Sequence, residues 1–322
     1  HRMIKVLVIS SDSHVWNLGE VVQAITFAKS TSQDLELDLN DEGPDFETLD
    51  LLKYIGDWDS RTTVVTRNAV QTLVGDIRFI KYSPNGAYFL TSTKNALANV
   101  TNNKDIKQPI GMFIGRSNVH RLYLSSYVYK HKLANQTFHY NPELEFHKNN
   151  LGLEELIDIY GVDTLPNAVH LIKNSPLVKD EKISYPILRA QHNNIYSEYY
   201  NFLVEIVCET YYTGRTFFPT EKTWRAIMLE TPFIVQGPQW HLHRLRDLGF
   251  QTFDRWWDEG YAEDPSDHQP YEIVKVIDSI AEKSIQELNT MYQEMQPILQ
   301  HNKKRFMELT GEDFEIFEND RY

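Results

Sequence analysis

The chain contains three closely spaced segments that decide its fold class: FLVEIVCET at 202–210, FFPTEKTWRA at 217–226 and PFIVQG at 232–237. The first and the third are short apolar runs, which are typical of buried parallel strands. In the middle segment, Thr220 is a good helix N-cap residue directly after Pro219, so we expect a loop and then a helix over 221–228. A strand, a helix and another strand in this order indicate an α/β sheet.

The first turn of this predicted helix carries Glu221 and Lys222. Open α/β sheets bind ligands beyond the carboxyl ends of their strands, where helix N-termini attract anions. Lys222 adds positive charge there, Glu221 can accept hydrogen bonds from ribose hydroxyls, and Glu209 ends the preceding strand. These positions predict a nucleotide site. Taken alone, the segment favours a simpler alternative, in which Glu221 complements the helix dipole and Lys222 is solvated.

A second strand, loop and helix start lies upstream. IGMFIG at 110–115 is a predicted strand, and the residues up to Lys132 carry apolar side chains at helical spacing. The loop contains Arg116, and Arg121 follows in the first helical turn. Both arginines can face an anion together with the backbone N–H groups of the helix N-terminus.

Length and composition fit two domains. The chain has 322 residues, and 41% of them are hydrophobic. This length exceeds the size at which a single hydrophobic core usually stops growing. The polar stretch 99–108 is typical of a linker, so we place a boundary near Pro109. We expect α/β domains over 1–108 and 109–270, and a helical segment over 271–322 that packs back on them. Pro297 should kink or split its helix.

Charge and cysteine content exclude several classes of protein. The net charge of −13 argues against an extended nucleic-acid surface, which must be basic. Cys208 is the only cysteine, so no intrachain disulfide can form, and a reducing compartment fits. No stretch approaches the roughly 20 apolar residues of a membrane helix. We therefore expect a soluble, cytoplasmic protein without a membrane span.

Other elements follow from local patterns. We expect strands at 3–10, 62–66, 77–81, 88–91 and 169–172, and helices at 19–29, 45–55, 154–159 and 240–248.

The two motifs together resemble the donor-binding region of the α-1,3-fucosyltransferase family. In that family a Tyr-x-Thr-Glu-Lys-x-Trp/Tyr segment precedes an apolar strand that ends in glycine, as FPTEKTWRA at 218–226 and TPFIVQGP at 231–238 do here. MFIGRSNVHR at 112–121 is similar to the family's strand, Ser-Asn loop and arginine. Related proteins of phages, giant viruses and bacteria continue with Leu-Gly-Phe-x-Thr-Phe, as LGFQTF at 248–253 does.

The resemblance covers 111–253 and implies a glycosyltransferase with two Rossmann-like domains, the arrangement called GT-B. The N-terminal domain would face the acceptor, and the domain over 109–270 would bind a nucleotide diphosphate sugar linked to GDP or UDP. The sugar would pass with inversion to a hydroxyl of a glycan or glycoconjugate, without a metal ion or another cofactor. If the protein is viral, it would act in the host cytoplasm.

The resemblance also implies roles for single residues. Glu221 would bind the nucleotide ribose, and Lys222 and Arg121 would neutralise the diphosphate. The family's tyrosine is Phe218 here, which removes a hydroxyl and leaves the donated sugar open. The complete set of expected donor-binding residues is Arg116, Ser117, Asn118, Arg121, Glu209, Phe218, Thr220, Glu221 and Lys222.

Glycosyl transfer needs a base that deprotonates the acceptor hydroxyl. Asp12 and His14, in the loop after the first strand, have the right topological position in the N-terminal domain. The alternative for both residues is a polar loop or a helix cap.

Other interpretations stay open. A non-catalytic glycan-binding protein with a degenerate transferase fold is favoured by Phe218, whereas an enzyme that glycosylates DNA bases, as some phage enzymes do, is opposed by the net charge. Asp57 and Asp59 have the Asp-x-Asp spacing of manganese-dependent, single-Rossmann (GT-A) glycosyltransferases, but they follow a predicted helix and not a strand.

Overall fold

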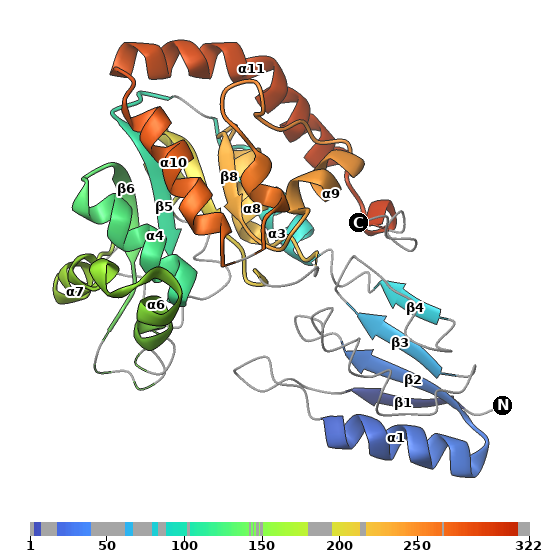
Figure 1. Ribbon diagram of the computed structural model, residues 1–322. Coiled ribbons are helices and arrows are strands. Elements are labelled where there is room, and N and C mark those ends of the chain that lie inside the picture. The colour runs from blue at the N-terminus through green and yellow to red at the C-terminus, as the bar shows by residue number, and fades with distance from the viewer. Residues whose placement is uncertain are drawn as a thin grey trace.

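The computed structural model describes residues 3–7, 18–39, 62–66, 79–82, 88–101, 104–141, 143, 145, 148, 151–179, 195–212, 217–265 and 267–314. This part of the chain forms two four-stranded sheets with helices around them, and all strand pairs are parallel (Figure 1). The predicted α/β class is therefore confirmed. Among the helices described, none combines the length and apolar character that crossing a membrane requires.

The first sheet has the strand order β1-β2-β3-β4. Leu35 and Leu37 of β2 are buried, as are residues of the helix α1 that precedes this strand. The predicted strands at 3–10, 62–66 and 77–81 and the helix at 19–29 are confirmed, whereas sequence reasoning missed β2. The predicted helix at 45–55 lies outside the described residues. The bounds are β1 Met3–Leu7, α1 Leu18–Thr31, β2 Asp34–Leu39, β3 Thr62–Thr66 and β4 Phe79–Tyr82.

The second sheet has the order β6-β5-β7-β8. From β5 the chain first adds β6 on one side and later returns to add β7 and β8 on the other. The strand order thus reverses between β5 and β7, and such a switch point is where open α/β sheets place their ligands. The bounds are β5 Gln108–Ile114, β6 Ala134–Phe138, β7 Phe202–Cys208 and β8 Phe233–Gln236.

Helices cover both faces of this sheet. Ser125 of α4 contacts Met112, whereas Arg225 of α8 contacts Glu205, the register neighbour of Gly111. Since adjacent residues of a strand point to opposite faces, α4 and α8 lie on opposite faces. α10 contacts α4, while α3 and α11 contact α8. The bounds are α3 Tyr88–Leu97, α4 Val119–Lys130, α6 Leu153–Tyr160, α7 Leu165–Lys173, α8 Glu221–Met228, α9 His241–Asp247, α10 Gln269–Ala281 and α11 Ile285–Glu308.

Two predicted strands are wrong. The segment 88–91 begins α3, and 169–172 lies in α7. In α7, Ala168 and Leu171 are the buried residues, and their spacing of three is helical rather than alternating. The predicted helices at 154–159 and 240–248 correspond to α6 and α9 and are confirmed.

Helix α3 precedes the predicted domain boundary near Pro109, yet it packs on elements that follow it. It contacts α8, and the Lys94 Nζ donates to the carbonyl oxygens of Met307 and Leu309 at 3.1 and 2.6 Å. These carbonyls lie at the end of α11, so Lys94 satisfies acceptors that a helix C-terminus leaves unpaired. The boundary itself stays a prediction.

The C-terminal helical segment divides before Pro297. Ser284 and Glu287 form a capping box that starts α11, and Pro297 lies inside that helix. We expected Pro297 to kink or split its helix; the split does not occur, because α11 continues through this residue. A proline removes one backbone hydrogen bond, but the flanking Met295 and Leu299 are buried and hold α11 in place. The helix contacts β5, β7 and α8, so it packs along the second sheet.

Candidate functional site

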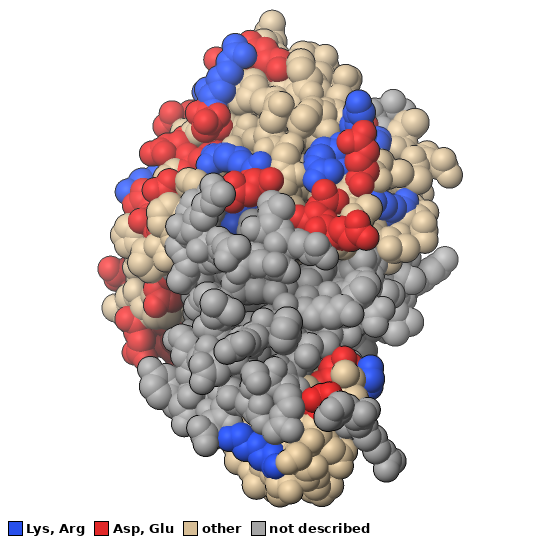
Figure 2. Space-filling model, turned by 90° about the vertical axis from the view of Figure 1, so that its right-hand side faces the viewer, with Lys and Arg blue, Asp and Glu red and all other residues tan. Residues whose placement is uncertain are grey.

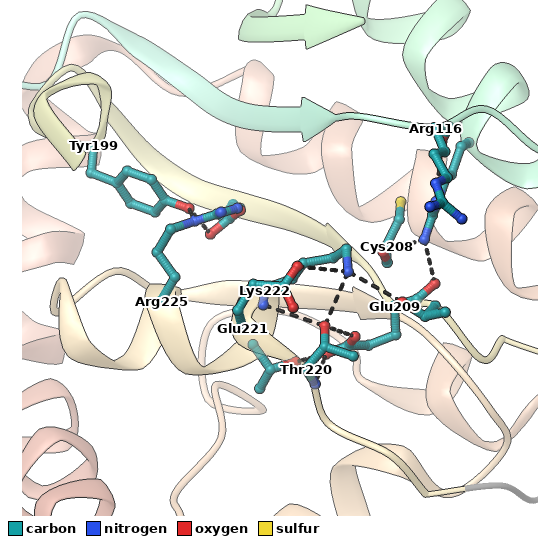
Figure 3. A network of polar contacts seen from close by, with 12 residues as sticks. Arg116, Tyr199, Cys208, Glu209, Thr220, Glu221, Lys222 and Arg225 are labelled. Carbon is teal, nitrogen blue, oxygen red and sulfur yellow. Dashed lines mark hydrogen bonds and ion pairs between the residues drawn. The ribbon is translucent and has the colours of Figure 1, made fainter. Parts of the chain in front are cut away.

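Two strand-to-helix connections meet at the carboxyl edge of the second sheet, at the switch point. One runs from β5 to α4, and the other runs from β7 to α8. Both had been expected from the sequence. The structure brings all nine predicted donor-binding residues into these connections or the first turns of their helices. Figure 3 shows a polar network that includes Glu209, Thr220 and Lys222.

The Ser-Asn loop builds the start of α4. Asn118 is the N-cap residue, and its Oδ1 accepts from the Arg121 N–H at 2.9 Å. The Ser117 Oγ donates to the carbonyl oxygen of Leu151 at 3.0 Å. Arg116 is exposed. Asn118 thus caps α4 through a local hydrogen bond, as small polar residues do at helix N-termini. Ser117 instead ties the loop to Leu151, a residue far along the chain.

Arg121 connects the two sides of the switch point. Its Nη1 donates to the Arg116 carbonyl oxygen at 3.0 Å, and its Nη2 donates to the carbonyl oxygens of Cys208 and Glu209 at 3.0 and 2.7 Å. The guanidinium is nearly buried, and its Nε has no partner among the described residues. Arg121 therefore brings positive charge to the crevice, but most of its donors hold the ends of β5 and β7 together.

Glu209 turns toward the start of α8. Its Oε1 accepts from the Thr220 N–H at 3.1 Å and the Thr223 hydroxyl at 2.6 Å, and its Oε2 accepts from the Thr220 hydroxyl at 2.5 Å. The side chain is fully buried. We expected Glu209 to contact a donor, but both carboxylate oxygens serve the helix N-terminus, which favours a negative charge. Its role in the structure is to position α8.

Lys222 lies at the centre of the network in Figure 3. Its Nζ donates to Thr210 Oγ1 at 3.2 Å, Thr220 Oγ1 at 3.1 Å and Glu221 Oε1 at 3.0 Å. The Lys222 side chain is 19% exposed, and that of Glu221 is 8% exposed. Three oxygens thus fix an ammonium group at the sheet edge, where an incoming anion can compete with the Glu221 carboxylate.

A buried ionic cluster lies beneath this helix start, and sequence reasoning missed it. Arg225 of α8 and Tyr199 both contact Glu205 of β7: the Arg225 Nη2 lies 3.2 Å from Oε1, and the Tyr199 hydroxyl donates to Oε2 at 2.8 Å. The Arg225 Nε also donates to the Tyr199 hydroxyl. Burial raises the pKa of Glu205, and Arg225 opposes that shift. The available signal was a glutamate within an otherwise apolar strand.

Phe218 occupies the position of the family's tyrosine and is buried. Only 4% of the residue is exposed, and its ring meets Tyr211 edge-on with the centroids 5.7 Å apart. The side chain therefore contributes to the core. We had expected a donor contact here.

The LGFQTF segment also serves packing. Phe250 lies 5.8 Å from Trp224 of α8, and Phe253 meets Phe233 of β8 edge-on at 5.2 Å between ring centroids. The Glu259 carboxylate accepts from the Phe253 N–H at 2.7 Å and fixes this segment. Its role in the structure is to hold α8 and β8 in place.

The predicted catalytic residues, Asp12 and His14, lie outside the described residues, as do Asp57 and Asp59. In the part of the chain that the structure covers, no three His, Cys, Asp or Glu side chains gather as a metal site would require. On the face shown in Figure 2, the described Lys and Arg residues are interspersed with Asp and Glu and form no broad basic area.

Comparison of the chain with models of known protein families and with curated protein sequences found no match.

Proposed function

We propose that the protein is a GT-B glycosyltransferase that transfers a sugar from a nucleotide diphosphate sugar to a hydroxyl of a glycan or glycoconjugate. The observation that carries the proposal is the meeting of two strand-to-helix connections at one switch point, with the partly exposed Lys222 side chain at that edge. The two parallel sheets support the expectation of two Rossmann-like domains, the first toward the acceptor and the second toward the donor.

The leaving diphosphate develops negative charge during glycosyl transfer, and preorganised positive groups stabilise it. Lys222 at the start of α8 and the Arg121 guanidinium would supply that charge. A phosphate that pairs with Lys222 releases the Glu221 carboxylate from its 3.0 Å contact. Glu221 could then accept hydrogen bonds from the ribose hydroxyls.

Several details of the proposal rest on the family resemblance alone. These are a GDP- or UDP-linked donor, inversion at the sugar carbon, independence of a metal ion, and Asp12 or His14 as the base that deprotonates the acceptor.

The proposal is tested by nucleotide binding. We expect GDP- or UDP-sugars to raise the thermal unfolding temperature of the wild-type protein, with CMP-sugars, which lack a diphosphate, as the comparison. Lys222→Met should remove this shift, because it removes the ammonium group that would pair with the diphosphate. Lys275→Met is the matched control, since Lys275 is an exposed lysine of α10 that pairs only with Glu272 in its own helix among the contacts described.

Glu221→Gln gives a second test with little change in shape. It should weaken binding of the nucleotide sugar without weakening binding of inorganic pyrophosphate, because its proposed contact is with ribose and the charge that competes for Lys222 is removed. If no nucleotide sugar shifts the wild-type unfolding temperature, the proposal fails.

One alternative function has specific support. Arg121 donates three hydrogen bonds to backbone carbonyl oxygens, and Phe218 is buried. Both observations fit a glycan-binding protein that keeps the transferase fold without its catalysis. This alternative predicts that glycans, but not nucleotide sugars, stabilise the protein.

A further inference from the structure

Aromatic rings gather on the α4 side of the switch point. The His120 ring of α4 meets the Tyr212 ring edge-on at 4.8 Å and the Tyr160 ring at 6.0 Å between centroids. Tyr160, the last residue of α6, stacks on Tyr123 of α4 at 4.1 Å and meets Tyr271 of α10 at 5.1 Å. These five rings, from three helices and the connection after β7, form one continuous aromatic cluster.

The aromatic cluster lies at the carboxyl edge of the second sheet. His120 precedes Arg121, whose Nη2 donates to the Glu209 carbonyl oxygen just beyond the end of β7 at 2.7 Å. Tyr212 follows three residues later in the same connection. α10 starts at this edge too, because the side chain of its first residue, Gln269, accepts from a backbone N–H directly after β8. The aromatic cluster and the proposed diphosphate site therefore share one sheet edge.

The aromatic cluster has a buried base and a partly exposed rim. His120 and Tyr160 are 1% and 6% exposed, and the His120 Nδ1 lies 2.5 Å from the Tyr160 hydroxyl. Tyr123, Tyr212 and Tyr271 are only partly buried. The base is therefore ordinary packing, whereas the rim presents ring surface directly to solvent.

Polar groups stand at this rim. The hydroxyls of Tyr123 and Tyr212 make no hydrogen bond to the residues that the structure describes. The Asp267 side chain is 66% exposed, and its Oδ1 lies 3.4 Å from the His120 Nε2. Tyr271 behaves differently, since its hydroxyl donates to a backbone carbonyl oxygen at 3.1 Å. Two hydroxyls and one carboxylate are thus available to an external partner.

The charges near the rim favour a neutral ligand. Burial raises the pKa of Tyr212, the Arg121 guanidinium opposes this shift, and the Glu155 and Asp267 carboxylates add to it. Both carboxylates are exposed, whereas Arg121 is 7% exposed and donates to backbone carbonyl oxygens. An anionic ligand would therefore meet negative charge first, whereas hydroxyl groups can donate to the carboxylates.

Partly exposed rings beside hydroxyls and carboxylates suit a saccharide. The apolar C–H face of a sugar ring can pack on an aromatic ring, and the sugar hydroxyls can pair with carboxylates and phenolic hydroxyls. A nucleobase can stack on the same rings, but it brings phosphates that the carboxylates disfavour. The rim therefore fits an uncharged sugar better than it fits a nucleotide.

We propose that Tyr123, Tyr212 and Asp267 form a platform that binds a neutral oligosaccharide, the acceptor of the transfer reaction. This inference rests on the proposed function, which supplies the nucleotide-sugar donor at the same sheet edge. The acceptor is then not held by the N-terminal domain alone. The platform holds part of it beside the diphosphate site.

The test separates the saccharide from the nucleotide. Dissociation constants for maltotriose, chitotriose and N-acetyllactosamine would be measured by NMR titration, and those for GDP and UDP by calorimetry, on wild type, Tyr212→Leu and Asp267→Asn. Tyr196→Leu is the control, because Tyr196 is 40% exposed and lies before β7, at the opposite sheet edge.

We expect at least one of the three saccharides to bind wild type and the control. Both site variants should bind it about tenfold more weakly and bind GDP and UDP as wild type does. Tyr212→Phe keeps the ring and should lose less than Tyr212→Leu. If Tyr212→Leu does not fold, Asp267→Asn still decides the question, because Asp267 is exposed and the change is nearly isosteric.

Each other result overturns the inference in a distinguishable way. If none of the saccharides binds wild type but GDP or UDP does, the platform does not exist and the proposed function is untouched. Equal saccharide binding by wild type and the site variants would place the acceptor elsewhere. Weaker binding of GDP or UDP to the site variants would assign the rings to the donor. If wild type binds no nucleotide or nucleotide sugar, the proposed function fails, and saccharide binding that depends on Tyr212 would then support the non-catalytic glycan-binding alternative.

Discussion

On the α8 face of β7, the carboxylates of Glu205 and Glu209 are almost fully buried and together accept five hydrogen bonds. Tyr199 and Arg225 donate to Glu205, and Thr220 and Thr223 donate to Glu209. At the end of β8, Gln236 and His241 are equally buried, and their side-chain polar atoms have no hydrogen-bond partner among the described residues. The difference teaches that burial alone does not identify a binding site. Satisfied polar groups build the scaffold, whereas a buried unsatisfied group calls for an explanation of its own.

The largest expected effect comes from removing a partner of the hydrogen-bonded carboxylates on the α8 face of β7. Arg225→Met leaves the Glu205 carboxylate buried without its charged partner, and removal of one member of a buried ion pair typically costs about 3–5 kcal/mol. We expect the free energy of unfolding, measured with urea, to fall by that amount. The double variant Glu205→Met, Arg225→Met should recover most of the loss, because no charge is left buried. A single variant as stable as wild type would contradict the cluster's role.

Glu209→Ala removes the other buried carboxylate of this region, at the start of α8. It leaves the Thr220 N–H and the two threonine hydroxyls without their acceptor, and each unsatisfied group costs about 1–3 kcal/mol. We expect a loss of about 3 kcal/mol in the free energy of unfolding. Glu209→Gln keeps one carbonyl acceptor and should lose less. Equal losses for both variants would show that the carboxylate's charge, and not its acceptor geometry, holds α8.

The pH dependence of stability probes the buried His241 side chain near the end of β8. The pKa of His241 is lowered by burial to about 3, below the ordinary value of 6.5. Between these values the unfolded chain binds one more proton, so the free energy of unfolding falls as pH falls. His241→Phe should reduce this slope by about 1.4 kcal/mol per pH unit between pH 6 and 4. An unchanged slope in urea unfolding would mean that His241 titrates normally.

The contribution of His120 acts in the same direction and does not confuse this test. Burial lowers the pKa of His120 to about 4. Because His120 is present in both proteins, its contribution cancels when the slopes are subtracted.

The smallest effect gives the sharpest comparison. Gln236→Leu and Gln269→Leu replace the same residue type at nearly equal burial, but of the two side-chain amides only that of Gln269 has hydrogen-bond partners among the residues described. We expect Gln236→Leu to raise the free energy of unfolding by about 1 kcal/mol and Gln269→Leu to lower it by about 1 kcal/mol. The measurement is urea unfolding at neutral pH. Changes of the same sign would remove the distinction between the two regions.

Much of the second sheet could be predicted from local patterns. Apolar runs identified β5, β7 and β8, and the cap residue Thr220 identified the start of α8, because strand burial and helix capping depend on neighbouring residues. The errors at 88–91 and 169–172 have the same origin. A short apolar run fits a strand and a buried helix turn equally well, and only packing decides between them.

The roles of the site residues could not be predicted to the same degree. Glu209 and Lys222 both stand beside a helix N-terminus in the sequence, and both were expected to contact a donor. In the structure the buried Glu209 carboxylate accepts hydrogen bonds from the start of α8, whereas the Lys222 side chain is still 19% exposed. The direction in which a side chain points at a strand end depends on which helix covers it, and that is a long-range contact.

By itself, the sequence determined that this is an α/β protein with a helix start between two buried strands and an arginine after a Ser-Asn loop, because these features arise from local hydrophobicity and capping. Tertiary contacts alone established that Arg121 bridges the ends of two strands and that Arg225 pairs with Glu205. They also left the side-chain polar atoms of Gln236 and His241 without hydrogen-bond partners within the described part of the chain. Those facts depend on which backbone groups and side chains meet after residues far apart in the chain pack together, and no local pattern records that.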